Sequence, residues 1–330
     1  MPSQYPIELS PPDIRPYKDG NTGVPYAHVL DSGKPGPNVM IQALTHGNEI
    51  CGAIALDTLL REGLKPVRGK LTLTFANVEA FSRFDYDDPD RSRFIDEDYN
   101  RVWGDDQLLG SRDSLELRRA RELRPFVDAA DLLLDLHSMH EPCEPIMVCG
   151  TIQKNADFAK AIGVPRALLL DTGHPAGLRM IERGGFGDPK SPKKAVLIEC
   201  GHHWEKRSAD VAIDTALRFL RVTGAVEEGW ATSRLRLQPV VPQRVVRVTE
   251  AVVAKTPQFH FLVPAVGLSV VEKAGTPIAR DGDRVWLAPY DDTVLVMPGI
   301  SNLKPGHTTV RLGRYEDPQA GHAGRPPKGE

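Results

Sequence analysis

Short apolar runs alternate with longer stretches of helical periodicity through the first two-thirds of the chain. Most of the apolar runs are continuous rather than alternating, which is typical of strands that helices cover on both faces. The runs expected to be strands are Val39–Leu44, Lys70–Ala76, Asp131–Leu136, Pro145–Cys149, Arg166–Leu170 and Ala195–Glu199. The stretches expected to be helices are Asn48–Arg61, Ser114–Ala130, Asn155–Ala161 and Ala209–Val222. This alternation predicts an α/β fold built on a mostly parallel sheet flanked by helices.

The pattern changes after about Gly229, where helical periodicity gives way to short strand-like segments separated by Pro and Gly. These segments include Arg244–Thr249, Leu268–Glu272, Asp283–Leu287 and Thr293–Met297. Such spacing is typical of a small all-β domain. We therefore expect an α/β domain over residues 1–231, an all-β domain over residues 232–314 and a flexible tail over residues 315–330.

Composition and charge exclude several classes of protein. A chain of 330 residues suits two domains. Its 41 basic and 44 acidic residues give a net charge of −3, so there is no electrostatic case for nucleic-acid binding. No apolar stretch approaches the roughly 20 residues of a membrane span, and no secretory signal is visible. The four cysteines lack CxxC spacing, which favours buried thiols in a cytoplasmic protein.

Two histidines and a glutamate follow buried strands and suggest a metal site. His46 and Glu49 lie three positions apart at a strand-to-helix turn, and His137 ends the strand that begins at Asp131. Strand ends at the carboxyl edge of an open α/β sheet are where sites form, so these side chains are expected to converge. Two imidazoles and a carboxylate are a ligand set of catalytic zinc. Asp135, two residues before His137, is either a partner of an imidazole or an ordinary strand-end polar group.

Glu199 closes an apolar strand, where a carboxylate is costly to bury unless it is paired or used. Near a metal-activated water it would act as a general base and then as a general acid. The adjacent His202 and His203 are expected to be solvated loop residues.

Arginines and an asparagine at the end of an acidic segment offer groups for binding substrate. Asn100 and Arg101 would suit a substrate carboxylate, and Arg93 would suit the developing charge of an oxyanion. Salt bridges to the surrounding acidic residues are the simpler interpretation of these residues when they are considered alone.

Four motifs together resemble those of the succinylglutamate desuccinylase/aspartoacylase family of zinc hydrolases, which is related to the M14 zinc carboxypeptidases. In chain order they are HGNE from His46, RFIDEDYNR from Arg93, DLHS from Asp135 and IECG from Ile198. The resemblance covers roughly residues 38–216. The strand-rich C-terminal part is similar to that of the family, and residues 271–279 are similar to a lipoyl-type hybrid barrel. The resemblance therefore implies a carboxypeptidase-like α/β domain followed by a small hybrid-barrel-like domain.

The resemblance implies cleavage of the amide bond between an acyl group and an amino acid, with one zinc ion per chain. It assigns roles to seven residues: His46, Glu49 and His137 as zinc ligands, Glu199 as general acid/base, Arg93 as the group that polarises the scissile carbonyl, and Asn100 and Arg101 as the pair that receives a substrate carboxylate. Aspartoacylases also carry an arginine shortly before the catalytic glutamate. Here Phe186–Pro192 contains none, although Arg179 and Arg183 lie further upstream. An N-acetylaspartate specificity is therefore not expected.

Two other functions stay open at this point. One is a zinc carboxypeptidase that acts on peptide C-termini, although an all-β domain that caps the cleft would restrict long substrates. The other is a non-catalytic binding protein on the same fold, for which a general base such as Glu199 would have no use. Assembly into a homo-oligomer also stays open.

Overall fold

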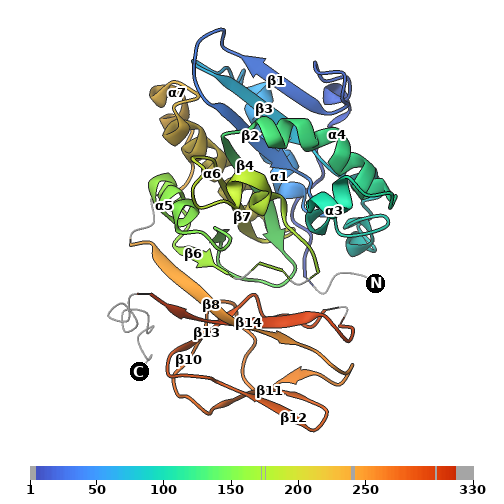
Figure 1. Cartoon of the computed structure of the whole chain (residues 1–330), viewed down its shortest axis with the longest axis vertical. Coiled ribbons are helices and arrows are strands. Elements are labelled where there is room, and N and C mark those ends of the chain that lie inside the picture. Colours follow the sequence, from blue (N-terminus) through green and yellow to red (C-terminus); the bar gives the residue numbers. More distant parts are fainter. Residues whose placement is uncertain (1–4, 172, 175, 239–241, 302, 317–330) are drawn as a thin grey trace.

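A computed structural model of the chain describes residues 5–171, 173–174, 176–238, 242–301 and 303–316. These residues form an eleven-stranded sheet in the order β1-β3-β2-β4-β7-β5-β6-β8-β14-β13-β10 and a three-stranded sheet in the order β12-β11-β9 (Figure 1). The first seven strands are β1 (Ala27–Asp31), β2 (Asn38–Ala43), β3 (Lys70–Phe75), β4 (Leu132–Met139), β5 (Ile146–Val148), β6 (Ala167–Leu170) and β7 (Lys194–His202). The later strands are β8 (Arg244–Val253), β9 (His260–Phe261), β10 (Val270–Val271), β11 (Pro277–Asp281), β12 (Arg284–Leu287), β13 (Thr293–Val296) and β14 (Thr308–Tyr315).

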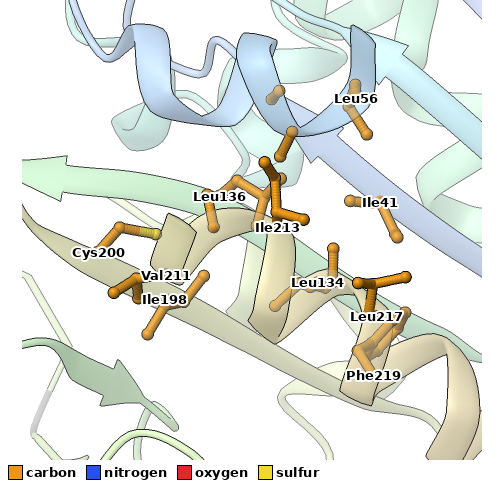
Figure 2. Packing of buried hydrophobic residues seen from close by; sticks show 14 of the residues in the cluster. Ile41, Leu56, Leu134, Leu136, Ile198, Cys200, Val211, Ile213, Leu217 and Phe219 are labelled. Carbon is orange, nitrogen blue, oxygen red and sulfur yellow. The ribbon is translucent and has the colours of Figure 1, made fainter. Parts of the chain in front are cut away.

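Helices cover both faces of the first half of the large sheet. On one face, residues of α1 and α6 pack with β2, β4 and β7 in a buried apolar cluster that includes Leu56, Leu134 and Leu217 (Figure 2). The α-helices are α1 (Ile50–Arg61), α2 (Val78–Phe81), α3 (Asp105–Leu108), α4 (Leu115–Ala129), α5 (Gln153–Ile162), α6 (Lys206–Thr223) and α7 (Glu228–Thr232). The 3₁₀ turns are η1 (Arg15–Tyr17), η2 (Pro89–Ser92), η3 (Tyr99–Arg101), η4 (Met180–Glu182) and η5 (Gly184–Phe186). In the described part of the chain, no helix has both the length and the apolar character needed to cross a bilayer.

The centre of the sheet is parallel, as predicted. Strand β2 pairs in parallel with β3 and β4, and β4 pairs in parallel with β7. Strand β1 at the edge and β5 next to β7 are antiparallel. Both β4 and β7 are longer than the apolar runs that predicted them, because the backbone pairing between the two strands continues to Met139 and His202. His137 and Glu199 therefore lie inside strands and face each other in register.

The C-terminal part consists of strands, as predicted. These strands pair with one another in antiparallel fashion and continue the large sheet (Figure 1). The first residues of β8, from Arg244 to Arg247, pair with β6, and β8 then pairs along its length with β14. A separate apolar cluster, which includes Val252, Ile278 and Leu312, forms the core of this part. The division into domains at residue 232 stays a prediction. Strand β14 includes Tyr315, and the rest of the predicted tail from residue 317 lies outside the described residues.

Candidate active site

His46 and Glu49 occupy the turn between β2 and α1. Both side chains are buried, and His46 Nδ1 lies 2.7 Å from Glu49 Oε1. Gly47 between them is tightly enclosed, since a Cβ built there would lie 2.4 Å from the Ser92 carbonyl oxygen. The Gly47 N–H donates to the Arg93 carbonyl at 3.0 Å. The glycine therefore lets the loop that carries Arg93 pack directly on the turn.

His137 in β4 lies on the other side of the same carboxylate. Its Nδ1 is 2.9 Å from Glu49 Oε2, and its Nε2 is 2.8 Å from Asp135 Oδ2. Asp135 has no exposed surface and also accepts a 2.8 Å hydrogen bond from the Thr45 hydroxyl. The hydrogen bond to Asp135 orients the His137 ring so that Nδ1 faces Glu49.

The second imidazole is held in the same way. His46 Nε2 lies 3.0 Å from Asp98 Oδ1, so that its Nδ1 also faces Glu49. Nothing in the sequence distinguished Asp98 from the other carboxylates of its acidic segment. Burial acts to raise the pKa of Asp98, but His46, Arg101 and Arg93 hold it well below its ordinary value.

His46, Glu49 and His137 therefore form a set of donors that fits a metal ion. One ligand atom from each of the three lies within 4.8 Å of the others. Burial acts to raise the pKa of Glu49, but the two histidines hold it well below its ordinary value, so this carboxylate is ionised. Two imidazoles and one carboxylate match the ligand chemistry of a catalytic zinc site, and the far nitrogen of each imidazole is bound to a carboxylate, Asp98 or Asp135.

Glu199 is a carboxylate of the site with a buried oxygen that has no hydrogen-bond partner among the described residues. It faces His137 across the β4–β7 pair. Burial raises the pKa of Glu199 to about 8. The charges of His137 and Arg93 act to lower this pKa, and the negative charge of Glu49 acts to raise it. A carboxyl group with a pKa near neutrality is suited to both taking up and releasing a proton.

Arg93 contacts two of the candidate metal ligands. Its Nη1 donates to Glu49 Oε1 at 3.2 Å, and its Nη2 lies 3.1 Å from His46 Nε2. About a third of the Arg93 side chain remains exposed, which leaves it accessible to a ligand in the site.

Asn100 and Arg101 lie in η3 next to Asp98. Asn100 Oδ1 accepts from the Met180 N–H at 3.0 Å, and Arg101 Nη1 donates to the Asn100 carbonyl at 2.8 Å. Arg101 Nη2 is 3.9 Å from Asp98 Oδ2, a distance that leaves this nitrogen able to bind another anion.

Arg179 is already satisfied by protein carboxylates. Its two Nη atoms donate to Asp171 at 2.8 and 2.6 Å, and Nη2 also donates to Glu182 at 2.7 Å. Arg183 is bound to Asp128 and Asp105 in a similar way. Neither upstream arginine therefore replaces the one missing from Phe186–Pro192.

His202 and His203 are buried, so the expectation that they are solvated is wrong. His202 is the last residue of β7, which extends beyond its apolar run, and His203 follows it directly. His203 Nδ1 lies 2.8 Å from the Ser138 hydroxyl, and burial lowers the pKa of His203 to about 3. A neutral imidazole therefore lines the region beside His137.

Comparisons with known proteins identify the family and the fold. A family model described as the succinylglutamate desuccinylase/aspartoacylase catalytic domain matches residues 35–222, more than half of the chain. No match was found among curated proteins. The structure is similar to a succinylglutamate desuccinylase from Vibrio parahaemolyticus, with 18% identity and a TM-score of 0.63, over 85% of this chain and 82% of that one.

Two further solved structures share the fold. One is a succinylglutamate desuccinylase from Chromobacterium violaceum, with 17% identity, a TM-score of 0.63 and 89% of each chain covered. The other is the ectoine utilization protein EutE from Ruegeria pomeroyi with a product bound, with 17% identity, a TM-score of 0.61 and 87% and 88% covered. Because the family model spans more than half of the chain, from before His46 to beyond Glu199, the chain belongs to the succinylglutamate desuccinylase/aspartoacylase family.

Proposed function

We propose that this protein is a zinc-dependent amidohydrolase that removes the acyl group from a small N-acyl amino acid. One observation carries the proposal. The Nδ1 atoms of His46 and His137 both face the Glu49 carboxylate, while the buried Oε2 of the half-buried Glu199 has no partner among the described residues. A binding protein needs no such uncommitted carboxylate next to a metal site, whereas a hydrolase needs a general base there.

His46, Glu49 and His137 would hold one zinc ion. When bound there, zinc supplies Lewis-acid chemistry, which polarises a carbonyl and lowers the pKa of water. Glu199 takes a proton from the attacking water and delivers it to the nitrogen of the departing amine. Arg93 donates hydrogen bonds to the carbonyl oxygen as negative charge develops on it.

The amino-acid part of the substrate would be held at η3. Arg101 Nη2, which makes only a 3.9 Å contact with Asp98, binds the α-carboxylate together with the side-chain amide of Asn100. Because η3 is joined to Asp98 and through it to His46, the carboxylate site has a fixed position relative to the metal ligands.

The first test is the metal content of the purified chain and of His137→Ala. We expect about one zinc per chain, lost in the variant, and Glu199→Gln should retain the zinc but lose nearly all turnover. A folded chain that takes up no zinc, or a Glu199→Gln variant with ordinary turnover, would overturn the assignment.

A substrate panel separates this proposal from a carboxypeptidase. N-acetyl amino acids should be hydrolysed, whereas blocked peptides with free C-termini should not.

The four cysteines are free thiols, which supports the cytoplasm as the compartment of this enzyme.

A further inference from the structure

Glu116 is a buried carboxylate at the start of α4 that binds the backbone of another segment. Its side chain has no exposed surface. Its Oε1 accepts from the Ile95 N–H at 2.7 Å, and its Oε2 accepts from the Asp96 and Glu97 N–H groups at 3.0 and 3.3 Å. The side-chain amide of Asn77 also donates to Oε1, at 3.0 Å. These donors and the N-terminus of α4 together compensate for the burial of the carboxylate.

The segment that Glu116 binds has no regular secondary structure. Residues 93–98 lie between η2 and η3 and belong to no helix or strand. The consecutive N–H groups of the tripeptide Ile95–Glu97 therefore have no ladder to join, and they donate to the Glu116 carboxylate instead. Backbone N–H groups need acceptors in a folded chain, so this side chain holds the tripeptide in place.

The contact runs in both directions, because side chains of the tripeptide bind the start of α4. Asp96 Oδ2 accepts from the Leu115 N–H at 2.7 Å. Glu97 accepts from the Ser114 hydroxyl and, at 2.6 Å, from Arg112. The tripeptide and the start of α4 therefore fix each other.

The anchored tripeptide lies between two residues that contact the candidate metal ligands. Arg93, two residues before it, places its Nη1 3.2 Å from Glu49 Oε1 and its Nη2 3.1 Å from His46 Nε2. Asp98, directly after it, places its Oδ1 3.0 Å from His46 Nε2. A shift of the tripeptide would therefore disturb both contacts at once.

The site assigned to the substrate carboxylate has an anchor of its own. Asn100 is buried, and its Oδ1 accepts from the Met180 N–H at 3.0 Å. Tyr99 next to it has no exposed surface and packs against Trp103, with 5.5 Å between the ring centroids. Release of the tripeptide should therefore leave the position of Asn100 unchanged.

We propose that Glu116 is a positioning residue of the active site. By holding the tripeptide, it keeps Arg93 where negative charge develops on the substrate carbonyl, and it keeps Asp98 against the ring of His46. The inference rests on the proposed function, because the roles of Arg93 and His46 are those described there. Glu116 acts through these residues and does not touch the substrate.

Glu116→Gln tests the proposal on the zinc-loaded enzyme. Each oxygen of Glu116 accepts from two donors, so an amide in either orientation leaves two donors without an acceptor. We expect kcat to fall by about tenfold to a hundredfold, since a displacement of about 1 Å in a catalytic group can cost a hundredfold. KM should change by less than about twofold, because the loss concerns the transition state and not the carboxylate site.

Zinc affinity gives a second readout. Asp98 should hold the His46 ring less firmly in Glu116→Gln, and loss of such a partner behind a histidine ligand costs at least about tenfold in metal affinity. A displaced Asp98 keeps part of its contact, so we expect a loss of up to about tenfold.

Asp214→Asn is the matched control. Asp214 is a buried carboxylate of α6. It accepts from the Arg236 and Leu237 N–H groups and from Arg218, so it also fixes a loop to a helix. Its substitution should lower the stability in urea and leave kcat and zinc affinity within about twofold of the wild type. Equal losses of kcat in the two variants, or an unchanged kcat in Glu116→Gln, would overturn the proposal.

Glu116→Asp is the conservative variant. It keeps the charge but is one methylene shorter, so its kcat should lie between those of the wild type and Glu116→Gln, again without a change in KM. If Glu116→Gln does not fold, Glu116→Asp carries the test. A lowered kcat with an unchanged KM then supports the proposal, and a wild-type kcat overturns it.

Hydrogen exchange distinguishes this inference from the proposed function, because it needs neither zinc nor turnover. The amides of residues 95–97 should exchange at least about tenfold faster in Glu116→Gln, the effect of losing one ordinary hydrogen bond, and should be unchanged in Asp214→Asn. If they exchange faster while kcat and zinc affinity stay at wild-type values, the positioning role fails. If the wild type hydrolyses no substrate but Glu116→Gln speeds exchange and weakens zinc binding, the proposed reaction fails and the positioning role stands.

Discussion

Asp135→Asn should weaken zinc binding without changing the shape of the site. The carboxylate accepts hydrogen bonds from His137 Nε2 and from the Thr45 hydroxyl, both at 2.8 Å. An amide offers one oxygen and one NH₂ group, so either orientation leaves one of these buried donors without an acceptor. The His137 ring is then held less firmly, and its metal-binding nitrogen becomes less basic.

The size of the effect follows from these contacts. Loss of such a partner behind a histidine ligand typically costs tenfold to a hundredfold in metal affinity, or about 1.4 to 2.8 kcal/mol. The buried unsatisfied donor should also lower the free energy of unfolding of the metal-free chain by about 1 to 3 kcal/mol. Zinc affinity is measured by competition with a chelating indicator at neutral pH, and stability is measured by urea unfolding.

Asp281→Asn is the matched control. Asp281 is a buried carboxylate of the C-terminal strands that accepts from the Lys255 and Thr256 N–H groups and the Thr256 hydroxyl. Its substitution should lower stability and leave zinc affinity unchanged. If Asp135→Asn binds zinc as tightly as the wild type, or if both variants lose affinity equally, the orienting role of Asp135 is refuted.

Two further predictions concern packing and a buried ion pair. Gly47→Ala places a methyl group within 2.4 Å of the Ser92 carbonyl oxygen, and we expect the free energy of unfolding in urea to fall by about 1 to 3 kcal/mol. Unchanged stability would show that the loop carrying Ser92 moves aside without cost. Arg179→Met leaves Asp171 buried without its partner and should cost about 3 to 5 kcal/mol near neutral pH. Burial acts to raise the pKa of Asp171, but Arg179 holds it below its ordinary value. The ion pair therefore stabilises the folded chain above about pH 4, and this stabilisation is lost as the pH falls through the lowered pKa. A difference between wild type and Arg179→Met that stays constant down to acidic pH would contradict this account.

Much of the fold and of the candidate metal site could be predicted because each ligand adjoins a buried strand. His46 follows β2, and His137 and Glu199 lie in β4 and β7, whose apolar runs are continuous in the sequence. Where strands pair in parallel, residues at corresponding ends come together without any further information. Strand β1 was not predicted, because it is an antiparallel edge strand with only one buried residue.

Residues that act through distant pairings could not be found in this way. Asp98 is one of several carboxylates in its segment, and only its distance from His46 sets it apart. The burial of His202 and His203 likewise depends on how far the hydrogen bonds between β4 and β7 continue.

The single large sheet limits how a substrate can reach the site. Strand β14 is hydrogen-bonded to β8, and β8 is hydrogen-bonded to β6. A hinged opening between the two halves of the sheet would have to break these hydrogen bonds, so the C-terminal strands are expected to keep a fixed position relative to the parallel strands. Substrate entry and product release then depend on local rearrangements around the site, and not on a hinge between the parallel strands and the C-terminal strands.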